Sequence, residues 1–241
     1  MKNKEFWSET KFVKTKKGYM PSKDEKHLGI GSRFVATIQI KIYEKIIQQY
    51  ANGYLLDLGC GNVPFYGLYK DKIFENVCVD WSNSFHKNPY LDFEVNLNEE
   101  IPLSSEQFDT ILATDVLEHI TKPDILMSEI ARLLKPQGKV IITVPFFYWL
   151  HEKPHDYFRY TEFALKMFCE QNNLKILLLQ AYGGVPEIIL DIVAKKIERS
   201  RLVSKLHLIS SNFFINSNLG KKVSFRTSND FPLGYCLVAQ K

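Results

Sequence analysis

Apolar and polar positions follow one another along this chain in blocks that predict helices and strands in turn. A helix is predicted over residues 34–50, where apolar side chains recur at helical spacing: Phe34, Val35, Ile38, Ile42, Ile46 and Ile47. Ser32 is the candidate N-terminal cap of this helix, and Asn52-Gly53 would end it. The continuous apolar run that begins at Tyr54 is typical of a strand buried on both faces.

The same alternation continues towards the C-terminus. Further strands are predicted at 76–80, 90–95, 108–114 and 139–144, with a helix from Lys122 to Leu134 that has Pro123 in its first turn. A second helix is predicted over 162–171, capped by Thr161, and strands over 174–182 and 234–239. Strands that alternate with helices predict a mainly parallel sheet with right-handed crossovers.

Composition narrows the class of protein. A chain of 241 residues favours one α/β domain with an elaboration, and a net charge of +4 is too small to argue for DNA binding. The four cysteines form no C-x-x-C pair, which favours reduced, buried thiols and a cytoplasmic protein. The lysine-rich N-terminus lacks the apolar core of a signal peptide, and no apolar run is long enough for a transmembrane helix.

The strand at 54–58 ends in an acidic residue and a tight glycine turn, Asp57-Leu58-Gly59-Cys60-Gly61-Asn62. Open α/β sheets bind ligands at this end of their strands, and glycine lets the backbone approach a ligand closely. A helix is predicted to start near Pro64, with its N-terminus facing an anionic group. Pro64 stands where the dinucleotide fingerprint has its third glycine, which counts against a nicotinamide cofactor.

Several motifs follow this loop in a fixed order. They are Phe108-Asp109-Thr110-Ile111, Val116-Leu117-Glu118-His119 and the run from Arg132 to Gly138. Together with D-L-G-C-G-N they resemble class I S-adenosylmethionine (SAM)-dependent methyltransferases of the type 11-like group, over about Tyr54 to Thr161. The resemblance implies a Rossmann-like α/β fold: a seven-stranded, mostly parallel sheet with an antiparallel last strand, helices on both faces and a helical lid insertion.

The resemblance also implies SAM as the cofactor. The residues that match its binding positions are Asp57, Gly59, Cys60, Gly61, Asp80, Trp81, Asn96, Leu97, Thr114 and Asp115. Asp80 lies 23 residues after Asp57, where an acid accepts hydrogen bonds from ribose hydroxyls. The family often has an acid at the position of Asn96, so this residue departs from the pattern while keeping an acceptor oxygen.

The stretch from His151 to Thr161 carries the candidate acceptor chemistry. Its pattern, H-x-x-P-x-D-Y-x-R-Y-T, resembles bacterial methyltransferases of surface-polysaccharide and other glycan pathways. A sugar hydroxyl needs a general base before it can accept a methyl group, and imidazole titrates near neutral pH. The catalytic candidates are therefore His119, His151 and His155, with Asp156 to orient one of them and Arg159 to grip an anionic acceptor.

A metal site is the alternative interpretation of the same region. Asp115, Glu118, His119 and His155 offer two carboxylates and two imidazoles, as a divalent cation requires. Ubiquinone-pathway O-methyltransferases and small-RNA 2′-O-methyltransferases resemble this pattern. Because E-H after this strand is also common in family members without a metal, the interpretation without a metal is preferred.

Two segments lie outside the motif region. Residues 1–33 form a lysine-rich arm or lid, and residues 183–233 are an insertion in the methyltransferase domain of 34–241. Apolar residues at helical spacing and basic residues over 186–209 predict a lid helix over the acceptor site. The alternative is a peripheral contact with the inner face of a membrane.

The function predicted from these patterns is SAM-dependent O-methylation of a sugar, nucleotide-sugar or lipid-linked saccharide. The alternatives are a SAM-fold binding module without catalysis, or methylation of a quinone-like small molecule or RNA. RNA is disfavoured because no basic stretch is interleaved with aromatic residues. The sequence names neither the acceptor, the methylated atom nor the oligomeric state.

Overall fold

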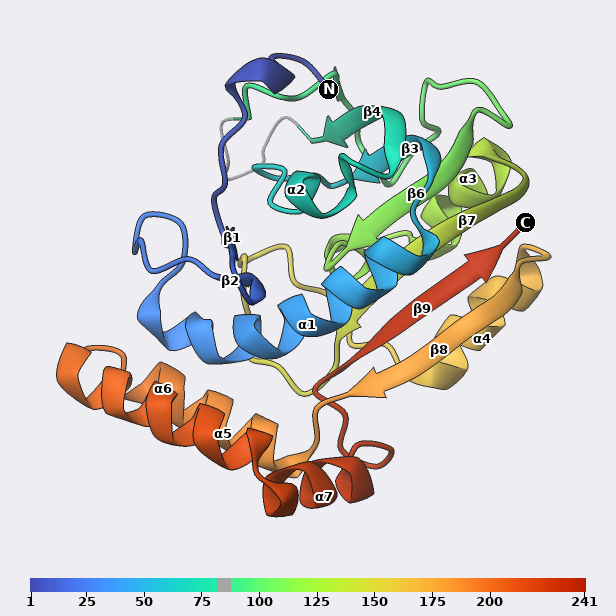
Figure 1. Cartoon of the computed structure of the whole chain (residues 1–241). Helices are drawn as coiled ribbons and strands as arrows, with labels where there is room; N and C mark the ends of the chain where they lie inside the picture. Colours follow the sequence, from blue (N-terminus) through green and yellow to red (C-terminus); the bar gives the residue numbers. More distant parts are fainter. Residues whose placement is uncertain (82–87) are drawn as a thin grey trace.

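A seven-stranded sheet forms the centre of the computed structural model, which describes residues 1–81 and 88–241 (Figure 1). Its strand order is β5-β4-β3-β6-β7-β9-β8. The strands are β3 (Gly53–Leu58), β4 (Ile73–Asp80), β5 (Phe93–Glu94), β6 (Phe108–Thr114), β7 (Leu134–Pro145), β8 (Lys175–Tyr182) and β9 (Gly234–Gln240). The last strand, β9, runs antiparallel to both of its neighbours, β7 and β8, and the described pairs among β3 to β7 are parallel, which confirms the predicted fold class.

Helices cover both faces of this sheet. α3 (Pro123–Leu133) and α4 (Glu162–Gln171) pack on one face, where Leu126, Ile130 and Leu165 are buried in the first core cluster. α1 (Arg33–Tyr50) and the single-turn α2 (Tyr66–Tyr69) lie on the other face. There Ile40 and Leu68 are buried in a second cluster, so each face of the sheet has its own hydrophobic core.

The strand register brings the predicted binding loops to one edge of the sheet. Asp57 in β3 lies opposite Cys78 in β4 and Leu112 in β6. The loops that follow β3, β4 and β6 therefore leave the sheet side by side. This is the edge at which open α/β sheets bind ligands.

Two elements near this edge are present but shorter than predicted. The helix expected to start near Pro64 is only the single turn of α2, because Val63 has a positive φ of 49° and residues 60–66 form consecutive turns. The strand expected over 90–95 is reduced to β5, since Tyr90 and Leu91 turn in to pack against the second core. No helix N-terminus therefore faces an anion at Pro64.

The caps and the other boundaries agree more closely with the sequence. Thr161 caps α4 as predicted, because its hydroxyl accepts a hydrogen bond from the Ala164 amide at 3.2 Å. Ser32 makes no such side-chain bond, since the 3-10 turn η2 (Ile30–Ser32) runs directly into α1. β7 begins at Leu134, immediately after α3, and is longer than the predicted strand of 139–144.

The N-terminal arm is folded onto the domain. It contains the 3-10 turn η1 (Lys4–Phe6) and a hairpin of β1 (Phe12–Thr15) and β2 (Gly18–Pro21). Phe12 stacks on Phe65 with ring centroids 5.5 Å apart, and the Tyr19 hydroxyl donates to the Gly67 carbonyl at 2.8 Å. The arm is thereby fixed to the segment that follows the glycine loop.

The insertion of 183–233 forms three helices, of which the first two pack beside α1 and the third packs against those two (Figure 1). They are α5 (Val185–Lys196), α6 (Arg201–Asn216) and α7 (Asn218–Thr227). The single helix expected over 186–209 is thus broken between α5 and α6. Within residues 1–81 and 88–241, no helix combines the length and apolar character needed to cross a bilayer.

Candidate functional site

A cleft of about 300 Å³ opens at the carboxyl edge of the sheet. Nine of the ten residues predicted to bind the cofactor line it: Gly59, Cys60, Gly61, Asp80, Trp81, Asn96, Leu97, Thr114 and Asp115. Leu97, Val116 and Ile120 supply apolar walls beside the carboxylates of Asp80 and Asp115. Apolar walls with a few convergent polar groups are typical of small-molecule sites.

The conformation of the glycine loop requires glycine at position 59. Gly59 has a φ of +64°, and a Cβ placed there would lie 2.6 Å from a methyl group of Val116. Gly61 also has a positive φ, of 50°, and its amide donates to the Asp80 carboxylate at 2.9 Å. The loop after β3 is therefore tied to the acid at the end of β4, which suits a ligand that spans both strands.

Asp57 lies beneath this loop and does not line the cleft. Its side chain is buried and accepts a hydrogen bond from the Tyr69 hydroxyl at 2.9 Å. Burial raises the pKa of Asp57 to about 7, against an ordinary value of 3.8, and outweighs the lowering effect of that bond. The position of Asp57 indicates that it supports the loop from below.

Asp115 follows β6 with a strained φ of 54°. Its carboxylate accepts hydrogen bonds from the Tyr43 hydroxyl at 2.9 and 3.0 Å and from the Thr143 hydroxyl at 3.1 Å. Burial and the nearby Asp115 charge raise the pKa of Tyr43 well above its ordinary value, which keeps the phenol protonated as a donor. Asp115 is thus fixed in its orientation by α1 and β7.

His119 ends the 3-10 turn η3 (Leu117–His119) and points into the cleft. Its Nδ1 lies 2.7 Å from the backbone carbonyl of His155. Because a carbonyl can only accept, Nδ1 carries the proton in this contact, and the lone pair of the neutral ring is on Nε2. This tautomer is the one that a general base acting through Nε2 requires.

His155 positions His119 through its backbone carbonyl and not through its imidazole ring. Its ring also lines the cleft, where Nδ1 lies 3.0 Å from the Tyr157 hydroxyl and the ring meets Trp81 edge-on at 4.7 Å. Glu152, which sequence reasoning did not single out, lies 3.9 Å from Nε2 of His119. Both residues come from the loop that follows β7, so this loop closes one side of the cleft.

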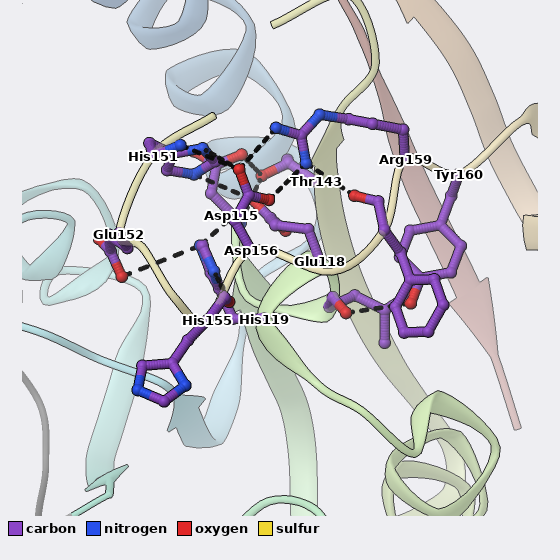
Figure 2. A network of polar contacts seen from close by, with 12 residues as sticks. Asp115, Glu118, His119, Thr143, His151, Glu152, His155, Asp156, Arg159 and Tyr160 are labelled. Atoms are coloured by element: carbon purple, nitrogen blue, oxygen red, sulfur yellow. Dashed lines mark hydrogen bonds and ion pairs between the residues drawn. The ribbon is translucent and has the colours of Figure 1, made fainter. Parts of the chain in front are cut away.

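Glu118 and His151 lie next to each other beside His119, with Glu118 buried and His151 partly buried (Figure 2). The Glu118 carboxylate is fully buried, and neither of its oxygens has a hydrogen-bond partner among the described residues. Nε2 of His151 and Nε2 of His119 each lie 3.7 Å from Glu118 Oε1, too far for a hydrogen bond. Burial alone would lower the pKa of His151, but Glu118, with Asp156 and Glu152 nearby, raises it, while burial raises the pKa of Glu118.

Asp156 and Arg159 are bonded to each other and lie outside the cleft. Arg159 donates to both oxygens of Asp156, at 2.5 and 2.8 Å, and to the Trp149 carbonyl at 3.1 Å. Asp156 also accepts from the His151 amide at 2.9 Å. Although burial would raise it, the bonds from Arg159 and His151 hold the pKa of Asp156 at about 2. Arg159 therefore pins its own loop in place, which is a different contact from the acceptor anion expected from the sequence.

The structure changes the set of metal-ligating candidates. Glu118, His119 and His151 each place one ligand atom within 4.8 Å of the others. The predicted set had Asp115 and His155 in place of His151, but Asp115 is held by Tyr43 and Thr143. The sequence could not identify His151 as the third member of this set. His151 lies far from Glu118 along the chain, and the folded path of its loop brings the two side chains together.

Residues 1–33, predicted as an arm or lid, supply a wall of the cleft whose individual residues the sequence did not assign. Four residues of this arm line the cleft: Thr10, Lys11, Lys26 and His27. The lysine-rich composition was the only signal of this wall. The contact depends on how Phe12 and Tyr19 anchor the hairpin, a long-range packing that no local pattern records.

The match to known families agrees with this geometry. A family model described as "Methyltransferase domain" matches residues 35–181, more than half of the chain. The chain therefore belongs to the methyltransferase domain family, and the class I SAM-dependent methyltransferase indicated by its motifs is confirmed as its class. SAM is the cofactor of that class, and the glycine loop, the Asp80 carboxylate and the apolar walls fit such a ligand.

Individual relatives have low sequence identity to this chain. The chain is 27% identical over 150 residues to a protein named ubiquinone biosynthesis O-methyltransferase from Bartonella bacilliformis, covering 52% of this chain and 57% of that protein. The match thus spans little more than half the length of that relative.

Solved structures share the fold at low identity. A SAM-dependent methyltransferase from Archaeoglobus fulgidus has a TM-score of 0.58 and 16% identity, covering 87% of this chain and 97% of that one. Phosphoethanolamine N-methyltransferase 2 from Haemonchus contortus, solved with SAM, has a TM-score of 0.54 and 17% identity, covering 88% of this chain and 56% of that one.

Proposed function

We propose that this protein transfers a methyl group from SAM to a hydroxyl group of a small-molecule acceptor. The observation that carries the proposal is the orientation of His119. Its Nδ1 is bound to the His155 carbonyl at 2.7 Å, and its side chain shares a cleft with the glycine loop and Asp80. A fixed imidazole beside a cofactor cleft is the arrangement that proton removal from a hydroxyl requires.

The residues of the cleft divide between cofactor and acceptor. Gly59 to Gly61 would hold the methionine end of SAM, Asp80 its ribose hydroxyls, and Asn96 with Leu97 its adenine. When bound, SAM supplies a methyl group on a positively charged sulfur, which is open to displacement. The arm residues Lys11 and Lys26 cover the same cleft and would help to exclude water.

His119 would act as the general base on the acceptor side. Its Nε2 would take the proton of the acceptor hydroxyl, and the His155 carbonyl would stabilise the resulting imidazolium through Nδ1. The buried Glu118 carboxylate, 3.7 Å from Nε2, would stabilise the same positive charge. Asp156 and Arg159 hold the loop that carries His155 and are positioning residues in this proposal.

Two acceptor classes have support. The H-x-x-P-x-D-Y-x-R-Y-T stretch favours a sugar, nucleotide-sugar or lipid-linked saccharide, while the name of the Bartonella relative favours a quinone-like acceptor. A phenol ionises near pH 10 and a sugar hydroxyl only at higher pH, so a sugar would depend more strongly on His119. Peripheral contact with a membrane would suit a lipid-linked member of either class.

A divalent cation is a second candidate for the same site. The buried Glu118 carboxylate without hydrogen-bond partners among the described residues favours it, and Glu118, His119 and His151 would hold the ion. Bound there, the ion would lower the pKa of a coordinated acceptor hydroxyl. Both candidates use Nε2 of His119, so they exclude each other.

The experiment that tests the proposal combines SAM binding with methyl transfer. Calorimetry should show SAM binding to the wild type, and Gly59→Ala should weaken it because of the strained φ and the contact with Val116. Gly29→Ala is the matched control, since nothing lies within 4 Å of a Cβ at that position.

Transfer is then measured with methyl-labelled SAM and panels of sugar and phenolic acceptors, before and after treatment with EDTA. Activity that survives EDTA supports His119 as the base, and activity restored only by a divalent cation supports the metal site. Absence of SAM binding at millimolar ligand would refute both.

A further inference from the structure

Helix α6 has its apolar side chains on the outside. Leu202, Leu206, Ile209 and Phe213 are 70, 60, 68 and 81% exposed. Their spacing of four, three and four residues places them on one stripe of the helix. An ordinary surface helix turns such a stripe towards the protein core.

The inner side of α6 is polar instead. Ser204 and Ser211 are buried at 4 and 1% exposure, half a turn away from the apolar stripe. Ser204 donates to the Ile197 carbonyl at 3.0 Å, and Nε2 of His207 lies 2.8 Å from the Leu190 carbonyl. Hydrogen bonds thus attach α6 to α5, and its apolar stripe contributes little to that attachment.

Helix α5 has the same inverted pattern. Ile189 and Ile192 are 55 and 53% exposed, while Glu187 and Asp191 are buried. Glu187 accepts from the Gly184 amide at 2.8 Å, and Asp191 pairs with Lys195. Two adjacent helices that both bury carboxylates or hydroxyls and expose isoleucine, leucine and phenylalanine indicate a surface made for apolar contact.

The charges around this surface are mainly positive. Residues 183–233 contain eight lysines and arginines and four acids, a net charge of +4. Two of the acids, Glu187 and Asp191, are buried and face inward. The exposed cations of this insertion include Lys196, Lys205, Lys221, Lys222 and Arg226 on the helices and Arg199 in the turn between α5 and α6.

We propose that the outer faces of α5 and α6 bind the surface of an anionic lipid bilayer. The apolar stripe would enter the boundary between headgroups and acyl chains, and the flanking cations would contact the lipid phosphates. A two-fold contact with a second copy of the chain fits less well, because the same set of cations would meet itself.

The loop that carries His151 continues the surface towards the cleft. Trp149 and Leu150 are 51 and 60% exposed, and Nζ of Lys195 in α5 lies 5.4 Å from the centre of the Trp149 ring. Tryptophan is favoured at the boundary between lipid and water. The bilayer contact would therefore lie next to the loop that closes the cleft, and it is proposed independently of which acceptor the protein methylates.

Sedimentation with lipid vesicles tests this proposal. The full chain should bind vesicles of phosphatidylglycerol and phosphatidylcholine in equal parts, and bind pure phosphatidylcholine much more weakly. Leu206→Ser with Phe213→Ser should reduce binding to the anionic vesicles about tenfold or more. Lys196→Gln and Lys205→Gln should each reduce it about fivefold.

Phe74→Ser is the matched control, because Phe74 is 72% exposed but lies at the start of β4. It should bind vesicles like the wild type.

Leu202→Ser with Ile209→Ser repeats the test on the other half of the stripe, and calorimetry with SAM shows that each variant is folded. Equal binding to both vesicle types would overturn the proposal, as would wild-type binding by both double variants. A dimer in ultracentrifugation that the double variants dissociate would overturn it in favour of a second copy.

Discussion

At the scale of single residues, Asp57 shows how burial makes an acidic residue near the end of a strand a determinant of stability. Its folded-state pKa of about 7 lies above its ordinary value of 3.8. Between these two values the folded chain holds a proton that the unfolded chain has lost. The free energy of unfolding must therefore fall as the pH rises through this window, by about 4 kcal/mol at most, and level off above it.

Asp57→Asn should remove this dependence, because the amide stays neutral and its oxygen still accepts from Tyr69. Relative to the wild type, the variant should become progressively more stable between about pH 4 and 7. Urea unfolding at several pH values measures the difference.

Asp109→Asn is the control. Burial would raise the pKa of Asp109, but Lys135 lowers it, so its contribution is already complete at pH 5 and constant above. A constant difference for Asp57→Asn over pH 4–7 would contradict the account.

His119 gives the residue-scale test of chemistry. His119→Gln should reduce kcat by about 10²- to 10⁴-fold and leave the dissociation constant of SAM unchanged, because the base acts only on the acceptor. His155→Ala should cost less, since the backbone carbonyl of His155 holds His119 and survives the substitution. Steady-state kinetics with calorimetry separates the two effects. A loss of SAM affinity in His119→Gln, or equal losses of kcat in both variants, would count against His119 as the base.

Much of the cleft could be predicted from the sequence because its residues follow strand ends directly. Gly59, Asp80 and Thr114 each lie at or just after the end of a strand, and parallel strands bring such ends together. The roles inside the later loop could not be predicted. Whether Arg159 faces an acceptor or Asp156 depends on the path of that loop, which no periodic pattern encodes.

At the scale of elements, the loop between β7 and α4 is the part that positions the chemistry. It is docked on η3, because the Tyr157 amide donates to the Glu118 carbonyl at 2.9 Å and the Tyr160 hydroxyl donates to the Leu117 carbonyl at 3.1 Å. The partly buried Asp156–Arg159 pair fixes its centre. The helices and strands on either side were predicted well, since each has a clear period and a cap such as Thr161.

Asp156→Asn should loosen this loop without affecting the glycine turn. We expect a loss of about 2–4 kcal/mol in the free energy of unfolding at pH 7, because the partner Arg159 loses its carboxylate. This contribution is present above the ordinary pKa of 3.8 and is lost as the pH falls towards 2. The value of kcat should fall while SAM affinity is retained. Glu162→Gln, which breaks an exposed pair with Lys166, should cost less than about 1 kcal/mol. Equal costs for the two variants would contradict the positioning role.

At the scale of the whole molecule, the sheet separates two cores, and the arm belongs to the second. Phe12 is 1% exposed and packs in the cluster that also contains Ile40 and Tyr69. The arm is therefore part of the cooperative unit as well as a wall of the cleft. Its composition indicated only a polar, basic segment, because the aromatic anchors Trp7, Phe12 and Tyr19 are spaced along 33 residues without a period.

Phe12→Ala should lower the free energy of unfolding by about 3–5 kcal/mol and weaken SAM binding, since the hairpin that carries Lys11 would lose its anchor. Phe6→Ala is the control, because Phe6 is 75% exposed. Urea unfolding and calorimetry measure both effects. An unchanged unfolding curve for Phe12→Ala would show that the arm is detached from the folding unit.

The inverted helices α5 and α6 are also a property of the whole molecule. Their apolar spacing was visible in the sequence, but spacing alone does not say which side faces the protein. The structure places Ser204 and Asp191 inside and Leu206 and Ile189 outside. That orientation is the observation on which the proposed contact with a lipid bilayer rests.

The most direct test of the central claim is transfer of label from methyl-tritiated SAM in fractionated cell extract. The wild type should place the label in a lipid, glycan or small-molecule fraction as an alkali-stable methyl ether, and His119→Gln should not. Label in RNA alone, or SAM binding without transfer to any fraction, would contradict a hydroxyl methyltransferase of small acceptors.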